Sequence, residues 1–201
     1  MPEPAGHYFD AEPGAASRPR IVRLDLPDRS LTLTTDRGVF SGDRVDPGTK
    51  YLLLDGPPLP ATGTFVDLGC GYGPIACTLA ARAPGATVWA VDVNQRALEL
   101  CRANATALGL TNVRAGRAEE VPSELVVDRL WSNPPIRIGK PALHDLLLAW
   151  LRRLAPDGRG VLVVQKHLGA DSLQRWLDAE GFAAERLGSR TGYRLLEVRR
   201  S

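Results

Sequence analysis

The fold of this chain is decided by the stretch Thr64-Phe-Val-Asp-Leu-Gly-Cys-Gly-Tyr-Gly-Pro74, which reads as a buried strand, a glycine-rich turn and the start of a helix. The glycines at positions 69, 71 and 73 allow φ values that other residues avoid and let the backbone approach a ligand closely. A proline at position 74 suits a first helical turn, because the N–H group that it lacks has no helical partner there. The stretch therefore predicts a strand–turn–helix unit with a ligand cradle at the turn.

A second acidic strand end supports this interpretation. The apolar residues 87–91 lead into Asp92, which follows Gly73 by about 20 residues, the spacing at which a carboxylate binds ribose in nucleotide-binding folds. The alternative is an acid that stabilises the N-terminus of the next helix.

The glycine spacing indicates which cofactor fits. A dinucleotide fold shows G-x-G-x-x-G and sets its pyrophosphate on the helix N-terminus, whereas this turn reads G-x-G-x-G and continues into Pro74, which has no N–H group. Asp67, just before the glycines, repels a pyrophosphate but suits an ammonium or sulfonium group. The turn therefore favours S-adenosylmethionine over NAD.

A third motif ends the predicted strand 125–131. Asn133 is followed by Pro134 and Pro135, which fix φ and keep the chain out of a helix. The Asn133 amide and the Pro134 carbonyl are therefore expected at the carboxyl edge of the sheet, where open α/β sheets bind ligands. By itself Asn-Pro-Pro is usually a plain turn, but its place after a cofactor cradle favours a catalytic role.

Together these motifs resemble those of the class I methyltransferases of the small-domain type, whose members include the small-subunit ribosomal RNA guanine-N2 methyltransferases. The resemblance covers nearly the whole chain, and its motifs are residues 38–41, 45–49, 67–73, 92–94, 133–137, 139–140 and 192–194. It implies an α/β fold with a Rossmann-like seven-stranded mixed sheet, mostly parallel with one antiparallel strand, helices on both faces and a small N-terminal β-rich cap. It also implies methyl transfer from S-adenosyl-L-methionine to an exocyclic amine, most simply guanine N2 in small-subunit ribosomal RNA, with S-adenosyl-L-homocysteine as the product.

The resemblance and the residue chemistry together suggest a cofactor site. Asp92 is expected to accept both ribose hydroxyls, and Asp67 to lie near the methionine end, with a turn-stabilising role as its alternative. The acid that often holds the adenine amino group is missing after the third strand, so the backbone of Arg117 or Ala118, or the side chain of Glu119, is expected to hold that edge. The predicted cofactor-binding residues are Asp67, Gly69, Cys70, Gly71, Asp92, Val93, Arg117, Ala118 and Asn133.

Catalysis is assigned to Asn133 and Pro134. The lone pair of an exocyclic amine is delocalised into its ring, and two acceptors that each take one N–H can pyramidalise the nitrogen and aim it at the methyl group. Positioning and electrostatics then supply most of the rate enhancement. The base must first leave its stack or lie in a loop.

The substrate side is predicted from fewer residues. Ile136 stands where related enzymes often have an aromatic residue, so Phe40 becomes the candidate for base stacking, with a place in the core of the cap as its alternative. Arg137 and Lys140 are candidates for phosphate contacts, or form a solvated pair. Methylation of a protein glutamine or of a small molecule, and cofactor binding without catalysis, are the competing functions.

Composition and charge fit one enzyme domain. The 201 residues are 44% hydrophobic, which is enough for a single core. Residues 134–201 carry 12 basic and 7 acidic side chains against 13 and 16 in residues 1–133, a split that is compatible with a nucleic-acid footprint near the active site and that also occurs in many enzymes with no polyanion. Three cysteines without metal-ligand spacing and the absence of a leader or a membrane-spanning run predict a cytoplasmic protein without a metal, as a monomer or homodimer.

Two units are expected along the chain: a tail and β-rich cap in residues 1–60, and the catalytic core in residues 61–201. The first fifteen or so residues read as a loose tail, and residues 21–26 and 31–34 as a hairpin, with 38–40 as a third strand. The core is predicted to contain strands 64–68, 87–92, 112–115, 125–131, 160–165, 183–187 and 193–199, and helices 74–83, 94–108, 141–154 and 170–181. The last two strands are expected to pair as a hairpin.

Overall fold

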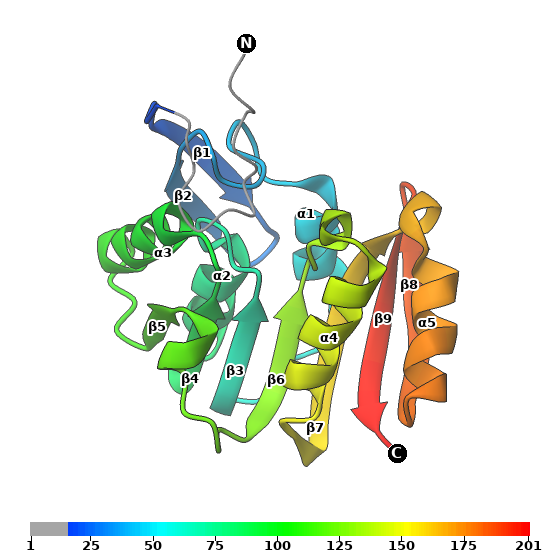
Figure 1. Ribbon diagram of the computed structural model, residues 1–201. Helices are drawn as coiled ribbons and strands as arrows, with labels where there is room; N and C mark the ends of the chain where they lie inside the picture. Colours follow the sequence, from blue (N-terminus) through cyan, green and yellow to red (C-terminus); the bar gives the residue numbers. More distant parts are fainter. Residues whose placement is uncertain (1–15) are drawn as a thin grey trace.

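A seven-stranded mixed sheet lies at the centre of the computed structural model, which describes residues 16–201 (Figure 1). Its strand order is β5-β4-β3-β6-β7-β9-β8. The strands are β3 (Thr62–Leu68), β4 (Gly85–Val91), β5 (Val113–Gly116), β6 (Val127–Ser132), β7 (Leu154–Gln165), β8 (Phe182–Arg190) and β9 (Tyr193–Arg200). Strand β9 runs antiparallel to both of its neighbours, and β3 to β7 pair in parallel. The predicted Rossmann-like sheet with one antiparallel strand is confirmed; the predicted tail lies outside the described residues.

Helices cover both faces of this sheet. Their bounds are α1 (Pro47–Asp55), α2 (Pro74–Arg82), α3 (Gln95–Ala107), α4 (Lys140–Leu151) and α5 (Ala170–Ala179), with short 3-10 helices η1 (Ala118–Glu120), η2 (Ile136–Ile138) and η3 (Lys166–Leu168). Helices α1 to α3 share one hydrophobic cluster and α4 and α5 the other, so the central strands are apolar on both sides. Among the described residues, every helix is too short or too polar to cross a membrane.

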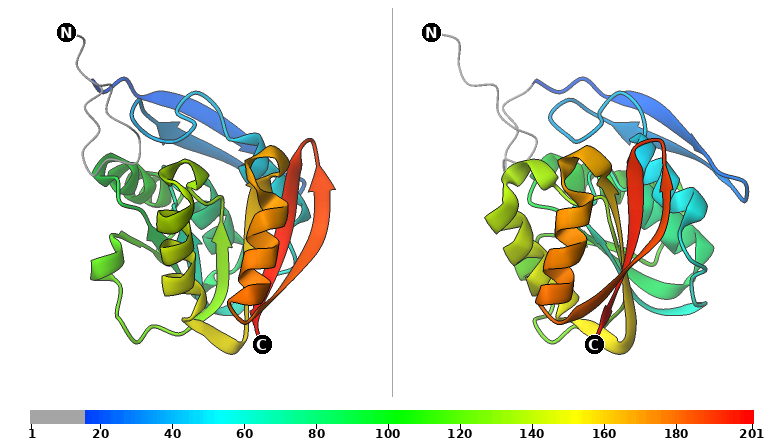
Figure 2. Two further views of the ribbon diagram at one scale, coloured as in Figure 1. Left: turned by 45° about the vertical axis from the view of Figure 1, so that its right-hand side comes forward. Right: turned by 90° about the vertical axis from the view of Figure 1, so that its right-hand side faces the viewer.

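The cap begins with an antiparallel hairpin, as predicted. Strands β1 (Arg20–Asp25) and β2 (Ser30–Thr35) pair in full register, and the hairpin lies over the end of the sheet toward which β3 and β6 point (Figures 1 and 2). The third strand predicted for residues 38–40 is wrong. That segment is a turn, because Gly38 and Ser41 adopt left-handed φ values of 77° and 54° and an extended strand cannot pass through them.

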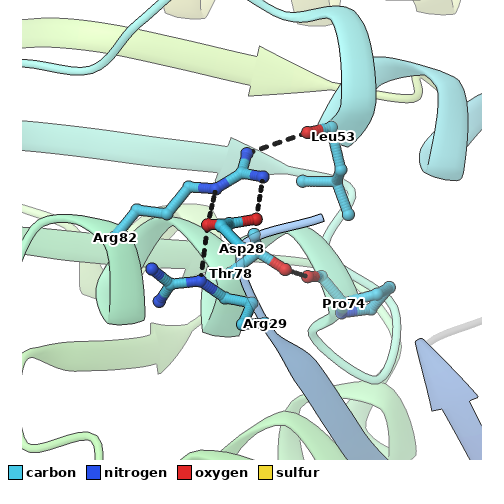
Figure 3. Close-up of polar contacts among 6 residues, drawn as sticks. All are labelled: Asp28, Arg29, Leu53, Pro74, Thr78 and Arg82. Carbon is cyan, nitrogen blue, oxygen red and sulfur yellow. Dashed lines mark hydrogen bonds and ion pairs between the residues drawn. The ribbon is translucent and has the colours of Figure 1, made fainter. Parts of the chain in front are cut away.

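One arginine joins the β1–β2 hairpin to helices α1 and α2 (Figure 3). Arg82 lies at the end of α2 and makes a bidentate contact with Asp28: its Nε and Nη2 donate to the two carboxylate oxygens at 3.0 and 2.9 Å. Its Nη1 donates to the Leu53 carbonyl at the end of α1. The Arg82 guanidinium holds the pKa of the Asp28 carboxyl well below its usual range. A bidentate fork of this kind fixes the hairpin turn and α1 relative to α2.

A buried asparagine makes a second connection, from α3 to the cap. The Asn104 side chain accepts from the Thr34 N–H at 2.7 Å and donates to the Thr34 carbonyl at 2.8 Å, so it pairs with the edge of β2 as a neighbouring strand does. The same amide donates to the Tyr72 carbonyl in the glycine-rich turn at 2.8 Å. Asn104 therefore holds the cap and the turn in one arrangement.

Replacing this amide tests that role. Asn104→Ala leaves three backbone groups without a partner: the buried Tyr72 carbonyl and the partly buried N–H and carbonyl of Thr34. A buried group without a partner costs about 1–3 kcal/mol, so the free energy of unfolding is expected to fall by at least about 1 kcal/mol. Urea unfolding measures the change. Thr106→Ala, on the exposed side of the same helix, is the control and should stay within about 0.5 kcal/mol of wild type. A loss in Asn104→Ala no larger than in the control would contradict the assignment.

Candidate functional site

A cavity of about 600 Å³ opens at the carboxyl ends of β3, β4 and β6, below the cap. It brings together most residues that the sequence suggested for the site, although these come from segments far apart in the chain. Of the predicted residues, those that line the cavity are Phe40, Gly69, Gly71, Asp92, Val93, Arg117, Ala118, Asn133, Pro134 and Arg137. Asp67, Cys70 and Lys140 are not among the lining residues.

Asp92 closes the glycine-rich turn onto the end of β4. One carboxylate oxygen accepts from the Gly71 N–H and the other from the Asn94 N–H, both at 2.9 Å. Each oxygen still has a lone-pair site for another donor, which is what two ribose hydroxyls require. Gly71 has a φ of 54°, and no atom lies within 4 Å of the point that a Cβ would occupy there, so the cradle stays open above it.

Asp67 lies beneath the turn and is fully buried. One of its oxygens accepts from the Ala76 N–H at 2.8 Å in the first turn of α2, and the other has no partner among residues 16–201. Burial raises the pKa of Asp67 to about 8, and the nearby Asp92 charge adds to the effect. In this position Asp67 supports the start of α2; its contact with the cofactor stays a prediction.

Cys70 also lies under the turn, as a small buried side chain. Its thiol contacts the Gly71 carbonyl at 3.4 Å, and burial raises the pKa of the thiol well above its ordinary value. A protonated, buried thiol is a poor nucleophile.

The Asn133 amide has a fixed orientation. Its nitrogen donates to an Asp46 carboxylate oxygen at 2.8 Å and to the Thr49 hydroxyl at 3.0 Å. Because a carboxylate can only accept, the amide NH₂ must face Asp46, and the amide oxygen is left as the free acceptor. Within the described part of the chain no donor bonds to that oxygen, so the geometry has the form that binding an amine requires.

The sequence analysis missed the role of Asp46 and Thr49. Asp46 is the N-cap of α1, accepts from the Thr49 N–H at 2.9 Å, and is followed by a proline in the first turn. The signal was therefore present as an ordinary helix start, but nothing local indicates that the same carboxylate reaches Asn133.

The Pro134 carbonyl is fixed by a tight turn. It accepts from the Ile136 N–H at 2.8 Å around Pro135, whose φ of −74° and ψ of 71° are those of an inverse γ-turn. A carbonyl has two lone pairs, so one remains for a substrate N–H. The two prolines thus set the direction of this acceptor.

Two aromatic side chains stand at the cavity. Phe40 is 39% exposed, so it lies outside the core of the cap. Tyr193, which the sequence analysis gave no role, is held by Gln165, whose amide donates to the phenol oxygen at 2.9 Å, and packs so closely on Gly48 that a side chain there would come within 2.5 Å of the ring. Both rings line the cavity.

The predicted adenine edge is the loop that follows β5. The Arg117 N–H is already used by the Glu120 carboxylate at 3.1 Å, so the Ala118 backbone and the Glu119 side chain are the stronger candidates on this loop. In residues 16–201, no three His, Cys, Asp or Glu side chains are grouped as metal ligands.

Comparisons with known proteins identify the family. The family model described as methyltransferase small domain matches residues 30–197. The uncharacterized protein YbxB of Bacillus subtilis (strain 168) is 32% identical over 197 residues, covering 96% of this chain and 98% of that protein. Ribosomal RNA small subunit methyltransferase C of Pseudomonas aeruginosa (strain LESB58) is 31% identical, over 95% of this chain and 58% of its own length.

A solved structure gives the same fold. The Thermus thermophilus 16S rRNA N2 G1207 methyltransferase, in complex with AdoMet and guanosine, aligns with a TM-score of 0.72 at 23% identity, over 94% of this chain and 52% of that one. Matches to the ribosomal RNA methyltransferases span about half of their length.

This chain therefore belongs to the methyltransferase small domain family, which confirms the resemblance seen in the sequence. It is an S-adenosyl-L-methionine-dependent methyltransferase, and the glycine-rich turn, the Asp92 carboxylate and the open cradle fit that cofactor.

The buried Asp67 predicts a pH effect on stability. Its pKa rises from an ordinary value of 3.8 to about 8 on folding, so the folded state holds the proton more tightly than the unfolded state. The contribution of Asp67 to the free energy of unfolding is therefore fully present below pH 4 and is lost as the pH rises towards 8. Asp67→Asn has no carboxyl group to titrate at this position. The difference between its free energy of unfolding and that of wild type should therefore rise with pH, in favour of the variant, by up to about 1.4 kcal/mol per pH unit between pH 5 and 8.

Denaturant unfolding at several pH values measures this difference. Asp157→Asn, at an exposed carboxylate in β7, is the control for the loss of one negative charge. A difference between Asp67→Asn and wild type that stays constant across this pH range would contradict the assignment.

The cofactor site is tested through Asp92. Asp92→Ala removes a charged acceptor for two hydroxyls, each hydrogen bond being worth about 1.5–3 kcal/mol, so the affinity for S-adenosylmethionine should fall at least about a hundredfold. Calorimetric titration measures the dissociation constant, with Glu99→Ala on the exposed side of α3 as the control. An unchanged dissociation constant in folded Asp92→Ala would rule out the ribose role.

Proposed function

We propose that this methyltransferase modifies an exocyclic amine of a base in ribosomal RNA, with guanine N2 as the target. The observation that carries the proposal is the Asn133 amide, whose nitrogen is held by Asp46 and Thr49 so that its oxygen is available as an acceptor at the cavity. An acceptor here suits a substrate N–H donor, and a guanine amine has two.

The chemistry follows from the two acceptors. The cofactor supplies a methyl group on a positively charged sulfur. The Asn133 amide oxygen and the Pro134 carbonyl each accept one N–H of the amine, which draws its lone pair out of conjugation and directs it along the line of transfer. As the new N–C bond forms, the S–C bond would break with its electron pair staying on sulfur, and the methylated amine would release one proton to water. Both groups are fixed before substrate arrives, Asn133 by hydrogen bonds and Pro134 by its γ-turn, so little reorganisation is needed.

Ribosomal RNA is favoured as substrate for three reasons. Several relatives at about 30% identity are named as ribosomal RNA methyltransferases, and a protein of the same fold is described as a 16S rRNA N2 G1207 methyltransferase. Arg137 lines the cavity and the exposed Lys140 follows it, where a phosphate of the bound strand can be held. The exposed Phe40 ring offers a surface for a base that has left its stack.

The same proposal covers location and assembly. Ribosomal RNA as substrate places the enzyme in the cytoplasm, and three free, buried cysteines suit a reducing compartment. The protein is proposed to act as a monomer or a homodimer. In either form the basic C-terminal part would contact the RNA.

Methyl transfer from tritiated S-adenosylmethionine tests the function. The protein is incubated separately with ribosomal RNA, assembled subunits, transfer RNA and total protein, and labelled RNA is digested for nucleoside analysis. The expected product is N2-methylguanosine in ribosomal RNA. Label in protein only, or only in a small molecule, would overturn the proposal.

Asn133 and its partner are tested together. Asn133→Ala is expected to keep the cofactor dissociation constant within about threefold of wild type while lowering kcat by at least about a hundredfold, because its hydrogen bond matters most as the amine changes shape in the transition state. In Asp46→Ser the serine side chain can still cap α1 but is too short to hold the Asn133 amide, so kcat should also fall. Asp46→Asn can still accept from the Asn133 amide and should restore most of the rate.

These variants are measured by single-turnover transfer and by calorimetry, with thermal unfolding as the check on folding. Full turnover in Asn133→Ala, or an Asp46→Ser rate equal to wild type, would refute the mechanism.

A further inference from the structure

We propose that a second groove, beside the cofactor pocket, binds a phosphodiester of the RNA strand whose base enters the pocket; this inference rests on the proposed function. The groove has a volume of about 480 Å³ and lies between η3 and the tip of the β8–β9 hairpin. We call it the hairpin groove, and its lining residues are 166, 167, 186 and 189–194.

The hairpin groove is lined by cations without an acidic side chain. Four of its residues are lysine or arginine: Lys166, Arg186, Arg190 and Arg194. Lys166 and Arg186 are exposed, and neither forms an ion pair with any residue in the described range 16–201. Arg190 has only a long contact of 3.8 Å with Asp55. Such a lining favours an anion.

Arg194 is the buried element of this groove. The residue is only 8% exposed, and it forms an ion pair with Asp171 in the first turn of α5. Its Nε–H group has no partner among the described residues. That nitrogen is itself buried and does not reach an anion in the groove, so what Arg194 contributes there is its positive charge.

Helix α5 begins directly after η3, next to the groove, although none of its residues lines the groove. It is ten residues long, begins after Gly169, and has no side-chain cap at its N-terminus. The free N–H groups of an uncapped first turn favour an anion there. Asp171 lies in that turn and competes for it, but its carboxylate is already engaged by Arg194.

Tyr193 connects the hairpin groove to the cofactor pocket, since it lines both cavities. The hairpin tip is a tight turn beside η3: Thr191 and Gly192 have φ values of 48° and 82°, as in a type I′ turn, and the Lys166 N–H donates to the Gly192 carbonyl at 2.7 Å. A base in the pocket and a neighbouring phosphate in the groove can therefore belong to one strand. A backbone held in the groove would orient the flipped nucleotide.

The test uses Lys166→Gln/Arg186→Gln, two exposed changes that leave Arg194 and the pocket intact. The control is Arg152→Gln/Arg200→Gln, which removes the same charge at the end of α4 and at the C-terminal end of β9. The probe is a fluorescein-labelled 12-nucleotide uridine RNA, and its affinity is measured by anisotropy at several salt concentrations. The log–log salt slope should be shallower by about 1.4 in the groove variant, at roughly 0.7 per lost single-strand contact, and unchanged in the control.

Two results would overturn the inference. One is a groove variant with the wild-type slope, and the other is an equal fall in both double variants, which would reflect net charge alone. The KM for methyl transfer to ribosomal RNA should also rise in the groove variant, with the S-adenosylmethionine dissociation constant unchanged. A wild type that binds the uridine RNA through the groove but methylates no RNA would reject the proposed function and not the groove.

Discussion

The hydrogen bond from the Asn133 amide to the Asp46 carboxylate is the constraint on which the site depends. It joins residues 87 positions apart and links the start of α1 to the end of β6. The same carboxylate caps α1, so the helix cannot form in place without presenting an acceptor to Asn133. Because the acceptor is a carboxylate, the amide has one favourable orientation, and its oxygen is available for a substrate donor. Folding of the cap segment thus prepares the reactive group.

Several groups at the site lower the free energy of unfolding of the protein when the pocket is empty. Burial raises the pKa of both Asp67 and Asp92, and the buried Asp67 carboxyl has only one backbone partner. The glycine-rich turn needs left-handed backbone at positions 69, 71 and 73, which only glycine adopts without strain. These costs are offset elsewhere, by Arg82 and Asn104, which fix the cap on the core. The cap and the core are thus held firmly around the glycine-rich turn and the buried carboxyl groups, as expected at a functional site.

The features that the sequence predicted are local in the chain. The glycine turn and the β1–β2 hairpin follow from turn residues and alternating apolar runs, and the antiparallel β9 follows from the family resemblance and the close spacing of the last two strands. The start of β7 at Leu154 was missed, because residues 156–158 read Pro-Asp-Gly, a turn signal that the sheet overrides. The Asp46–Asn133 bond, the role of Tyr193 and the hairpin groove were not predictable, since each joins segments that only the folded chain brings together.

A crystal structure with S-adenosylhomocysteine and guanosine tests the central claim most directly, because it shows which atoms of the chain meet the amine. The Asn133 amide nitrogen is expected to stay on Asp46 and Thr49, and its oxygen and the Pro134 carbonyl to lie within about 3.2 Å of the guanine amine nitrogen. An amide that has turned its nitrogen to the base, or a base amine bound away from both acceptors, would contradict the claim.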